Sequence, residues 1–455
     1  MNLKHIFILL ILIILLAPTF LFSQNGADSS SDSSSVPYPE YMTIRGIERD
    51  ETHSGDKFRS FLNVLFFVPR KMLDGILFSA IYGARLLIGS KEIERADAYF
   101  LKIPKTVVWT PILFVDSDLR PLVGLTVLYR KSRYGSLVGG SYTAEHKWEL
   151  QANITYTILR KLGIWKVKLR GLIDEDDDRR YYGIGAEPKT DERSHFLLGT
   201  TAEFGIYSQR REKVDVVLGI RPTKYWEFFL SSLLQKRRLA NAGYTEPLIG
   251  DVADLNEIQG GNRVNQWYNE IAVMYDTRAY RGRFSKGVKI DSYFGISNGV
   301  DEDKSRFLRA GIDLAGFFRV IKNNRFIVPR ILFDMVDNLE DNVDIPFTEY
   351  PHIREYRGTA KSNVIRTDNY TLLPSLEYQW PISTRINAHL FYDYFMVAKE
   401  LDKFSLGNGL WAVGLGFDFH TFQEEVLRFE FVAGSDGFRM RLNFGLSNFS
   451  RRDIN

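Results

Sequence analysis

Apolar and polar side chains alternate strictly near the carboxyl end of the chain. Phe438 and Met440 occupy one set of alternate positions, and Arg439 and Arg441 occupy the other. Successive side chains of a β-strand point to opposite faces, so this segment predicts a strand with one apolar and one charged face. The pattern recurs in sixteen segments between residues 106 and 449. Such repetition predicts an all-β antiparallel transmembrane barrel, with lipid outside and water inside.

The connections between the predicted strands supply a count. The three longest, 174–194, 226–266 and 338–369, are all odd-numbered when counted from the first strand. A barrel with both termini in the periplasm has short turns on the periplasmic side and longer loops outside. Because the longest connections are all odd-numbered, the strand count is predicted to be even, which favours sixteen strands over fifteen or seventeen. A count that differs by one hairpin, and so by two strands, stays open. The expected strands lie near residues 106–115, 121–130, 135–145, 147–159, 164–173, 195–207, 213–225, 267–276, 287–297, 306–318, 325–337, 370–380, 384–397, 408–420, 425–434 and 438–448.

Composition narrows the classes of function. The 455 residues are 45% hydrophobic, with a mean hydropathy of −0.18, as expected when half of each strand faces a watery lumen. The 33 Phe, 23 Tyr and 7 Trp residues suit aromatic girdles at two membrane interfaces. The absence of cysteine excludes a disulfide framework and thiolate chemistry. A net charge of +3 indicates no nucleic-acid partner, and we expect no cofactor or metal site.

The chain begins with a segment typical of an export signal. Lys4 precedes a continuous apolar run over 6–16, and Ser23 is a small residue at the expected cleavage point. An uncleaved anchor helix is the alternative, because the apolar run is near the lower length limit for crossing a bilayer. The expected organisation is a signal peptide at 1–23, a disordered Ser/Asp-rich linker at 24–56, a short helical periplasmic or plug segment at 57–104, the barrel at 105–449 and a C-terminal tail at 450–455. An irregular connector is the alternative for 57–104.

Four segments resemble motifs of the bacterial surface antigen family, the BamA/TamA-type outer-membrane assembly and translocation barrels. They are an aromatic-Gly-Ile-Gly loop at 181–185, an Asp-Thr-Arg turn at 276–278 followed by a glycine, an Arg-Gly loop tip at 353–358, and two acidic strand motifs at 376–381 and 391–393. Their order and spacing, with five strands after the long loop, make the resemblance specific. The motif positions are Tyr182, Gly183, Gly185, Asp276, Arg278, Gly287 and Gly358.

The long segment 338–369 carries the candidate site. A barrel hairpin does not need so many residues, and long ordered loops are usually functional. If this loop folds into the lumen, its arginine needs a carboxylate partner, because an unpaired buried guanidinium is costly. Strand parity points Glu377 and Asp393 into the lumen from adjacent strands. The favoured loop cation is Arg354, with Arg357, next to Gly358, as the alternative; a solvated extracellular loop is the other alternative.

The resemblance implies insertion or assembly of proteins in the outer membrane, or their translocation across it. In the family mechanism the first and last strands pair weakly, and the seam between them opens sideways. The implied partners are outer-membrane lipid, lipopolysaccharide and client outer-membrane or secreted proteins, and no enzymatic activity is implied. Residues 37–104 show no repeated periplasmic domain of the family type, so the chain resembles a short member. The alternatives are a passive channel or structural porin and, less favoured, an outer-membrane lipase.

Three further features have simpler interpretations. The acidic run 174–178 is predicted to be a solvated loop, with Ca²⁺ binding or a bridge to lipopolysaccharide as the alternative. The basic residues 236–238 are predicted to lie in the long 226–266 loop, as a solvated patch or a contact for lipopolysaccharide phosphates. His389, His420 and Asp418 lack a serine in a nucleophile setting, so a polar lumenal network is favoured over hydrolase chemistry.

Overall fold

The computed structural model describes residues 106–444 with short gaps. The described residues exclude 1–105 and 445–455, so the predicted signal peptide, linker, helical segment and tail lie outside them. The side chains of the first three strands are likewise not described. The internal gaps are 116–120, 132–133, 144–147, 161–162, 244–245, 259, 279–285, 302, 322–324, 341–342, 352–354, 359–365, 383–385, 421–424 and 436.

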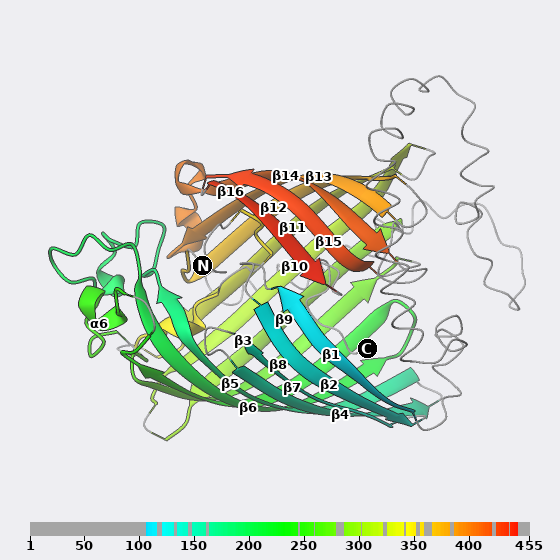
Figure 1. The fold of residues 1–455 in the computed structure, drawn as a ribbon, viewed down its shortest axis with the longest axis horizontal. Coiled ribbons are helices and arrows are strands. Elements are labelled where there is room, and N and C mark those ends of the chain that lie inside the picture. Colours follow the sequence, from blue (N-terminus) through cyan, green and yellow to red (C-terminus); the bar gives the residue numbers. More distant parts are fainter. Residues whose placement is uncertain are drawn as a thin grey trace, which may run out of the picture. The chain divides into compact units, whose positions relative to one another are not determined.

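One antiparallel sheet contains all the described strands, in chain order from β1 to β16 (Figure 1). This confirms the all-β antiparallel fold predicted from the sequence. Within the described residues no hydrogen bonds join β1 to β16, and these two strands end the sheet. The strands are β1 (Thr106–Val115), β2 (Pro121–Lys131), β3 (Tyr134–Thr143), β4 (Trp148–Arg160), β5 (Gly163–Tyr181), β6 (Gly205–Arg221), β7 (Trp226–Ala240), β8 (Arg263–Asp276), β9 (Gly287–Gly299), β10 (Arg306–Ile321), β11 (Arg325–Asn338), β12 (Tyr370–Pro381), β13 (Ile386–Ala398), β14 (Leu410–His420), β15 (Glu425–Gly434) and β16 (Gly437–Phe444).

Among the residues that the structure describes, helical structure is confined to short turns between strands. They are η4 (Glu192–Ser194), α6 (Ile249–Val252), η5 (Phe347–Glu349), η6 (Leu401–Lys403) and η7 (Leu406–Asn408). Across the described ranges, none of the helices has the length and apolar character needed to cross a membrane.

Two strands differ from the sequence prediction. The polar stretch at 208–212, predicted as a turn, lies inside β6, and residues 195–204 precede that strand. The predicted 226–266 loop begins with strand β7. In β6 the polar residues fit a strand because Arg211 pairs with the buried Asp174 of β5 at 2.7 Å. In β7 the consecutive apolar residues from Phe228 concealed the alternation between faces.

The acidic run at 174–178 is therefore not a solvated loop, because β5 extends to Tyr181. Asp174 is 4% exposed and accepts two hydrogen bonds from the Arg211 guanidinium. The basic residues at 236–238 likewise belong to β7 rather than to a loop. Both runs were misassigned because charge alone does not separate a loop from a strand whose inner face is polar.

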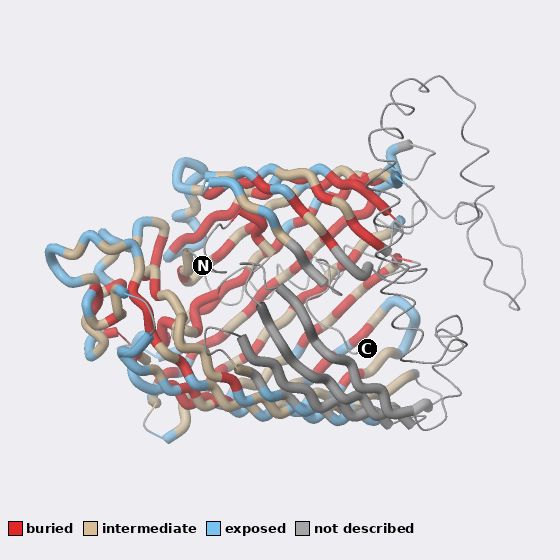
Figure 2. The backbone as a smooth tube through the Cα atoms, in the orientation of Figure 1, coloured by how far each residue is buried: buried red, intermediate tan, exposed pale blue. Residues whose placement is uncertain are grey.

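Buried and more exposed residues alternate along β7 and along most of β11 (Figure 2). In β7 the side chains of Phe228 and Leu230 are exposed, whereas Glu227 and Phe229 are buried. In a soluble protein most charged side chains are exposed and large apolar side chains are buried, so this distribution is the reverse. This inversion is typical of a sheet whose outer face contacts lipid.

The loop between β11 and β12 contacts strands that are far apart in the sheet. Glu349 of this loop pairs with Arg237 of β7, and Tyr356 donates a hydrogen bond to the Trp411 carbonyl in β14. In a flat sheet, seven strand spacings would separate β7 from β14 by about 34 Å. The sheet is curved between these strands (Figure 1), and one loop reaches both of them.

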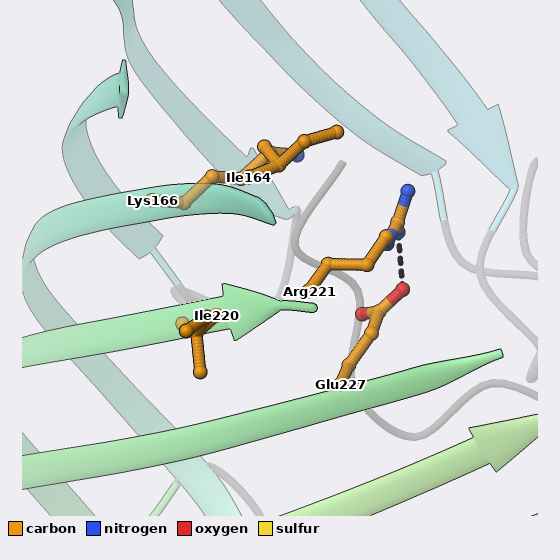
Figure 3. A pocket seen from close by; sticks show the side chains of 6 residues that line it. Ile164, Lys166, Ile220, Arg221 and Glu227 are labelled. Carbon is orange, nitrogen blue, oxygen red and sulfur yellow. Dashed lines mark ion pairs between the residues drawn. The ribbon is translucent and has the colours of Figure 1, made fainter. Parts of the chain in front are cut away.

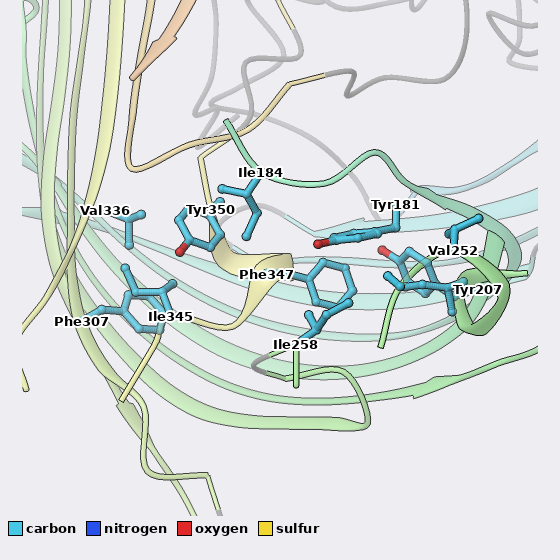
Figure 4. Packing of buried hydrophobic residues seen from close by; sticks show 12 residues of the cluster. Tyr181, Ile184, Tyr207, Val252, Ile258, Phe307, Val336, Ile345, Phe347 and Tyr350 are labelled. Carbon is cyan, nitrogen blue, oxygen red and sulfur yellow. The ribbon is translucent and has the colours of Figure 1, made fainter. Parts of the chain in front are cut away.

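An apolar cluster joins three loops at the same end of the sheet (Figure 4). Phe347 of η5 meets the rings of Tyr181 and Tyr207 edge-on, with centroids 5.0 and 5.6 Å apart. Ile249 and Val252 of α6 are buried in the same cluster. Burying an aromatic or branched side chain contributes about 1.5–3 kcal/mol. The long connections are thus packed against one another, and they hold the β11–β12 loop at its N-terminal half.

Candidate functional site

Arg357, in the β11–β12 loop, binds two carboxylates of neighbouring strands. Its Nε and Nη2 atoms donate to Asp393 of β13 at 2.8 and 2.6 Å. Its Nη1 atom donates to Glu377 of β12 at 2.6 Å. The backbone N–H of Arg357 adds a bond of 3.2 Å to Asp393. A planar guanidinium that engages a carboxylate with two parallel bonds is both strong and geometrically specific.

The three side chains are almost fully buried. Arg357 is 5% exposed, Glu377 2% and Asp393 1%. The guanidinium carbon also lies 3.5 Å from the centre of the Phe391 ring, where cation–π attraction adds to the ion pairs. In this position each charge depends on its partners, because an unpaired buried ion costs several kcal/mol.

Strand register explains why the two carboxylates meet. β12 and β13 are adjacent, and Ser375 lies directly opposite Asp393 in the ladder. Glu377 is two residues further along β12, so it points to the same face and reaches the same space. The hydroxyl of Ser375 donates to Asp393 at 2.6 Å and accepts from Arg357 at 3.0 Å. The structure therefore brings Arg357, Glu377 and Asp393 together.

Of the two arginines left open by the sequence, Arg354 lies outside the described residues. Gly358 follows Arg357 and packs so closely against Tyr356 and Ala412 that a side chain would not fit. Gln379, two residues further along β12, donates to Glu377. A second cation, Arg428 of β15, lies 3.7 Å from the Glu377 carboxylate.

The ionic cluster continues around the sheet. The two ring nitrogens of His389 lie 3.0 Å from Asp418 and 3.1 Å from Glu430. Only the doubly protonated imidazolium donates from both nitrogens, so His389 is a cation in this arrangement. Glu430 also lies 3.7 Å from Arg357 and 3.5 Å from Arg441 of β16. The cluster pairs four carboxylates with four cations: Glu377, Asp393, Asp418 and Glu430 with Arg357, Arg428, Arg441 and His389.

A second, oppositely charged contact holds the same loop. Glu349 of η5 is 5% exposed and lies 2.9 Å from Arg237 of β7 and 3.4 Å from Arg309 of β10. Gln235 donates a further hydrogen bond to it at 3.1 Å. Sequence reasoning missed this contact because Arg237 was assigned to a loop. The loop is thus held by an anion at Glu349 and by a cation at Arg357.

The aromatic-Gly-Ile-Gly motif lies in the β5–β6 loop, next to the end of the β11–β12 loop. Gly183 and Gly185 have φ angles of +84° and +93°, which glycine adopts without strain. The Gly185 N–H donates to the Thr367 carbonyl at 2.8 Å. The ring of Tyr182, the preceding motif residue, lies tilted against that of Phe204, with centroids 5.5 Å apart. These residues support the long loop from outside the Arg357 cluster.

Arg193 joins the same two loops by ion pairs. It lies 2.6 Å from Asp191 and 2.9 Å from Asp368. Burial raises the pKa of Asp191, but the hydrogen bonds from Arg193 outweigh it and hold that pKa below its ordinary value. For Asp368 burial is the larger effect and raises the pKa despite the same arginine.

The Asp-Thr-Arg motif lies at the opposite end of the strands from these loops. Arg278 donates to Asp276 at 2.8 and 3.0 Å, and its guanidinium lies 4.7 Å from the Phe317 ring. A side chain on Gly287 would come within 3.0 Å of the Arg278 backbone. The motif therefore shapes the β8–β9 connection and does not contact Arg357.

A hollow of about 240 Å³ lies between β5, β6 and β7, away from the ionic cluster (Figure 3). Ile164, Lys166 and Ile220 line it, and Arg221 pairs there with the buried Glu227. The ion pair satisfies this carboxylate, so we explain the hollow as packing space. Within the described ranges, no group of three or more His, Asp or Glu side chains is placed to hold a metal ion.

Comparison with known proteins identifies the fold. No protein-family model and no curated protein matches the sequence. Among solved structures, BamA from Haemophilus ducreyi lacking POTRA domains 1–3 has 11% identity and a TM-score of 0.51, covering 76% of this chain and 69% of that chain. CdiB from Acinetobacter baumannii has 8% identity and a TM-score of 0.43, covering 75% and 59%. The fold of this chain is therefore similar to that of BamA, as its sequence motifs predicted.

Proposed function

We propose that this chain is a surface-antigen-type outer-membrane barrel that inserts proteins into the outer membrane or moves them across it. The barrel has sixteen strands and closes between β1 and β16, with both termini in the periplasm. The β11–β12 loop docks in the lumen. The observation that carries the proposal is the buried contact of Arg357 with Glu377 and Asp393, on a sheet of the BamA type.

The proposed mechanism involves no bond chemistry, and we propose that the protein is not an enzyme. Client strands or lipid enter where β1 and β16 meet. Pro111 of β1 lacks a backbone N–H, which removes one donor from any ladder on that strand. The sheet order, which ends at β1 and β16, supports a seam with few hydrogen bonds.

The docked loop keeps the lumen closed at rest. Its two anchors, Glu349 and Arg357, have opposite charges and bind different strands. Neither anchor can leave without exposing buried partner charges, so the closed position is strongly favoured. A passive porin, in which the loop merely narrows an open pore, would conduct steadily without such release.

Single-channel conductance in planar bilayers tests this proposal. We expect small fluctuating currents from the wild-type protein, a larger conductance from Arg357→Gln, and the largest from Glu349→Gln/Arg357→Gln. Lys224→Gln, which removes an exposed cation at the β6–β7 turn, is the matched control and should conduct like wild type. A large, steady wild-type current that no loop variant changes would instead establish the porin.

Client handling needs its own measurement. We expect the reconstituted protein to accelerate folding of an unfolded outer-membrane barrel into vesicles of the same lipid. Arg357→Gln should reduce that acceleration, and Lys224→Gln should retain it. Equal folding rates with and without the protein would remove insertion from the proposal and leave translocation to be tested.

A further inference from the structure

Three arginines stand in one row on the outward face of the sheet. In the ladder Arg210 of β6 lies directly opposite Arg238 of β7, and Arg238 lies directly opposite Arg263 of β8. Like charges at directly opposed positions destabilise a sheet. The row is therefore unfavourable unless a negative group lies over it.

The flanking arginines each keep a large part of the side chain exposed beside a carboxylate partner. The Arg210 Nε atom lies 3.3 Å from Glu212, and the Arg263 Nη2 atom lies 3.8 Å from Asp301. The side chains of Arg210 and Arg263 are 48% and 40% exposed. Arg238, between them, is also exposed, and none of the described carboxylates lies within ion-pair distance of it. The middle of the row thus has uncompensated positive charge.

The row lies just beyond the exposed apolar band of the same strands. Below Arg238 on β7, Leu234 and Leu230 are 54% and 53% exposed, and the neighbouring Trp267 of β8 is 50% exposed. At the other end of β7, the ring of Trp226 packs at a tilt against Tyr275, with centroids 4.5 Å apart, as residues of an interfacial aromatic girdle would.

Strand geometry gives the height of the row. The twelve residues from Trp226 to Arg238 span about 40 Å along the strand, or about 28 Å of height at a tilt of about 45°. The apolar band of an outer-membrane barrel is about 25 Å tall. Arg238 therefore lies where the headgroup phosphates of the outer leaflet begin.

We propose that Arg210, Arg238 and Arg263 form a binding site for the phosphate groups of lipopolysaccharide. This site rests on the proposed outer-membrane location of the barrel. A guanidinium binds phosphate with two parallel bonds, and a phosphate over the row converts the repulsion between arginines into attraction. The acyl chains lie along Leu230, Leu234 and Trp267. A free phosphate ion would make no use of this apolar stripe, so the charge and apolar surfaces together fit a phosphorylated lipid.

Binding of fluorescent lipopolysaccharide to the folded full chain in detergent micelles tests the site. A basic residue near an anionic lipid surface contributes about fivefold in affinity. Arg238→Gln should therefore weaken binding about fivefold, and Arg210→Gln/Arg238→Gln/Arg263→Gln about 100-fold. Lys224→Gln, with the same charge loss at the opposite end of β7, should bind like wild type. Dephosphorylated lipopolysaccharide should bind the wild-type protein as weakly as the triple variant binds the intact lipid.

Two outcomes would overturn the site: equal binding by wild type and triple variant, or equal binding of intact and dephosphorylated lipid. Inorganic phosphate at roughly 10 mM, the concentration range of weak ionic contacts, should not displace the lipid. Displacement would show that the arginine row binds free phosphate rather than a phosphorylated lipid. Folding of every variant is checked by the mobility difference between unheated and heated samples in detergent gels. Failure of the wild-type chain to insert into any bilayer would contradict the proposed location itself, whereas insertion with no phosphate preference contradicts only the arginine row.

Discussion

Arg357 is held by partners that lie far from it in sequence, and its energetics follow from burial. Glu377 and Asp393 accept its hydrogen bonds from within a space that water barely reaches. A buried ion pair adds little stability relative to an apolar replacement, but removal of one partner costs about 3–5 kcal/mol because the remaining charges are uncompensated. Substitution of one member therefore measures how strongly the loop depends on the cluster.

Arg357→Gln should lower the free energy of unfolding by about 3–5 kcal/mol, measured by urea titration in lipid vesicles. It leaves Glu377 and Asp393 buried without their main cation. Arg170→Gln is the control, because the Arg170–Asp215 pair involves an arginine whose side chain is 49% exposed. That exposed pair should contribute less than about 1 kcal/mol. Similar losses in the two variants would show that the Arg357 site is not energetically special.

At the same scale, the sequence favoured Arg354 as the loop cation and kept Arg357, the residue that binds Glu377 and Asp393, as the alternative. Both arginines are in the loop, and only the path of the loop decides which one reaches β12 and β13. Parity did predict that Glu377 and Asp393 share a face, because side-chain direction alternates locally along a strand. The contact of Glu377 with Arg428 involves β15 and depends on how the strands are ordered.

The strands were predicted from the alternation of apolar and polar residues. This signal fails where both faces of a strand carry apolar side chains. β7 contains apolar residues on both faces from Phe228 to Leu230, so the sequence suggested a loop or a short helix there. Its neighbours β6 and β8 supply the backbone hydrogen bonds that make it a strand. The sequence missed β7 and predicted an extra strand at 195–207. These two errors cancel in the strand count, so the alternation of long and short connections was still predicted correctly.

The outward face of β7 gives a test of lipid contact at this scale. Leu230 is 53% exposed, and Leu198, in the β5–β6 loop, is fully exposed. Leu230→Arg should reduce the unfolding free energy in vesicles by about 2–4 kcal/mol, because an arginine near the bilayer midplane is costly. Leu198→Arg should have little effect. Equal tolerance of both substitutions would contradict a membrane-facing β7.

On the scale of the whole molecule, the curvature of the sheet is revealed by the β11–β12 loop, which reaches β7 through Glu349 and β14 through Tyr356. The loop and its two anchors contact strands that are not adjacent in the sheet and are separated there by several other strands. The sheet order places β1 and β16 at its ends, and closure between them stays a prediction of the sixteen-stranded barrel.

Cysteine cross-linking tests this closure, and the chain has no native cysteine to interfere. We expect Leu113→Cys in β1 to form a disulfide with either Phe438→Cys or Met440→Cys in β16, read as a mobility shift on non-reducing gels. Phe431→Cys/Met440→Cys is the positive control, because those positions are directly opposed in β15 and β16. A control that cross-links while neither seam pair does would argue against closure at these residues.

The sequence by itself determined the antiparallel all-β fold and the face to which most charged residues point. These properties depend on the period of each strand and on the length of each connection, both of which are local. Only the tertiary structure decided that Arg357 reaches Glu377 and Asp393, that Glu349 pairs with Arg237, and that three arginines line up across β6, β7 and β8. The most distant of those contacts, between Arg237 and Glu349, joins residues 112 positions apart (349 − 237), so they depend on strand register and sheet curvature, which no local pattern encodes.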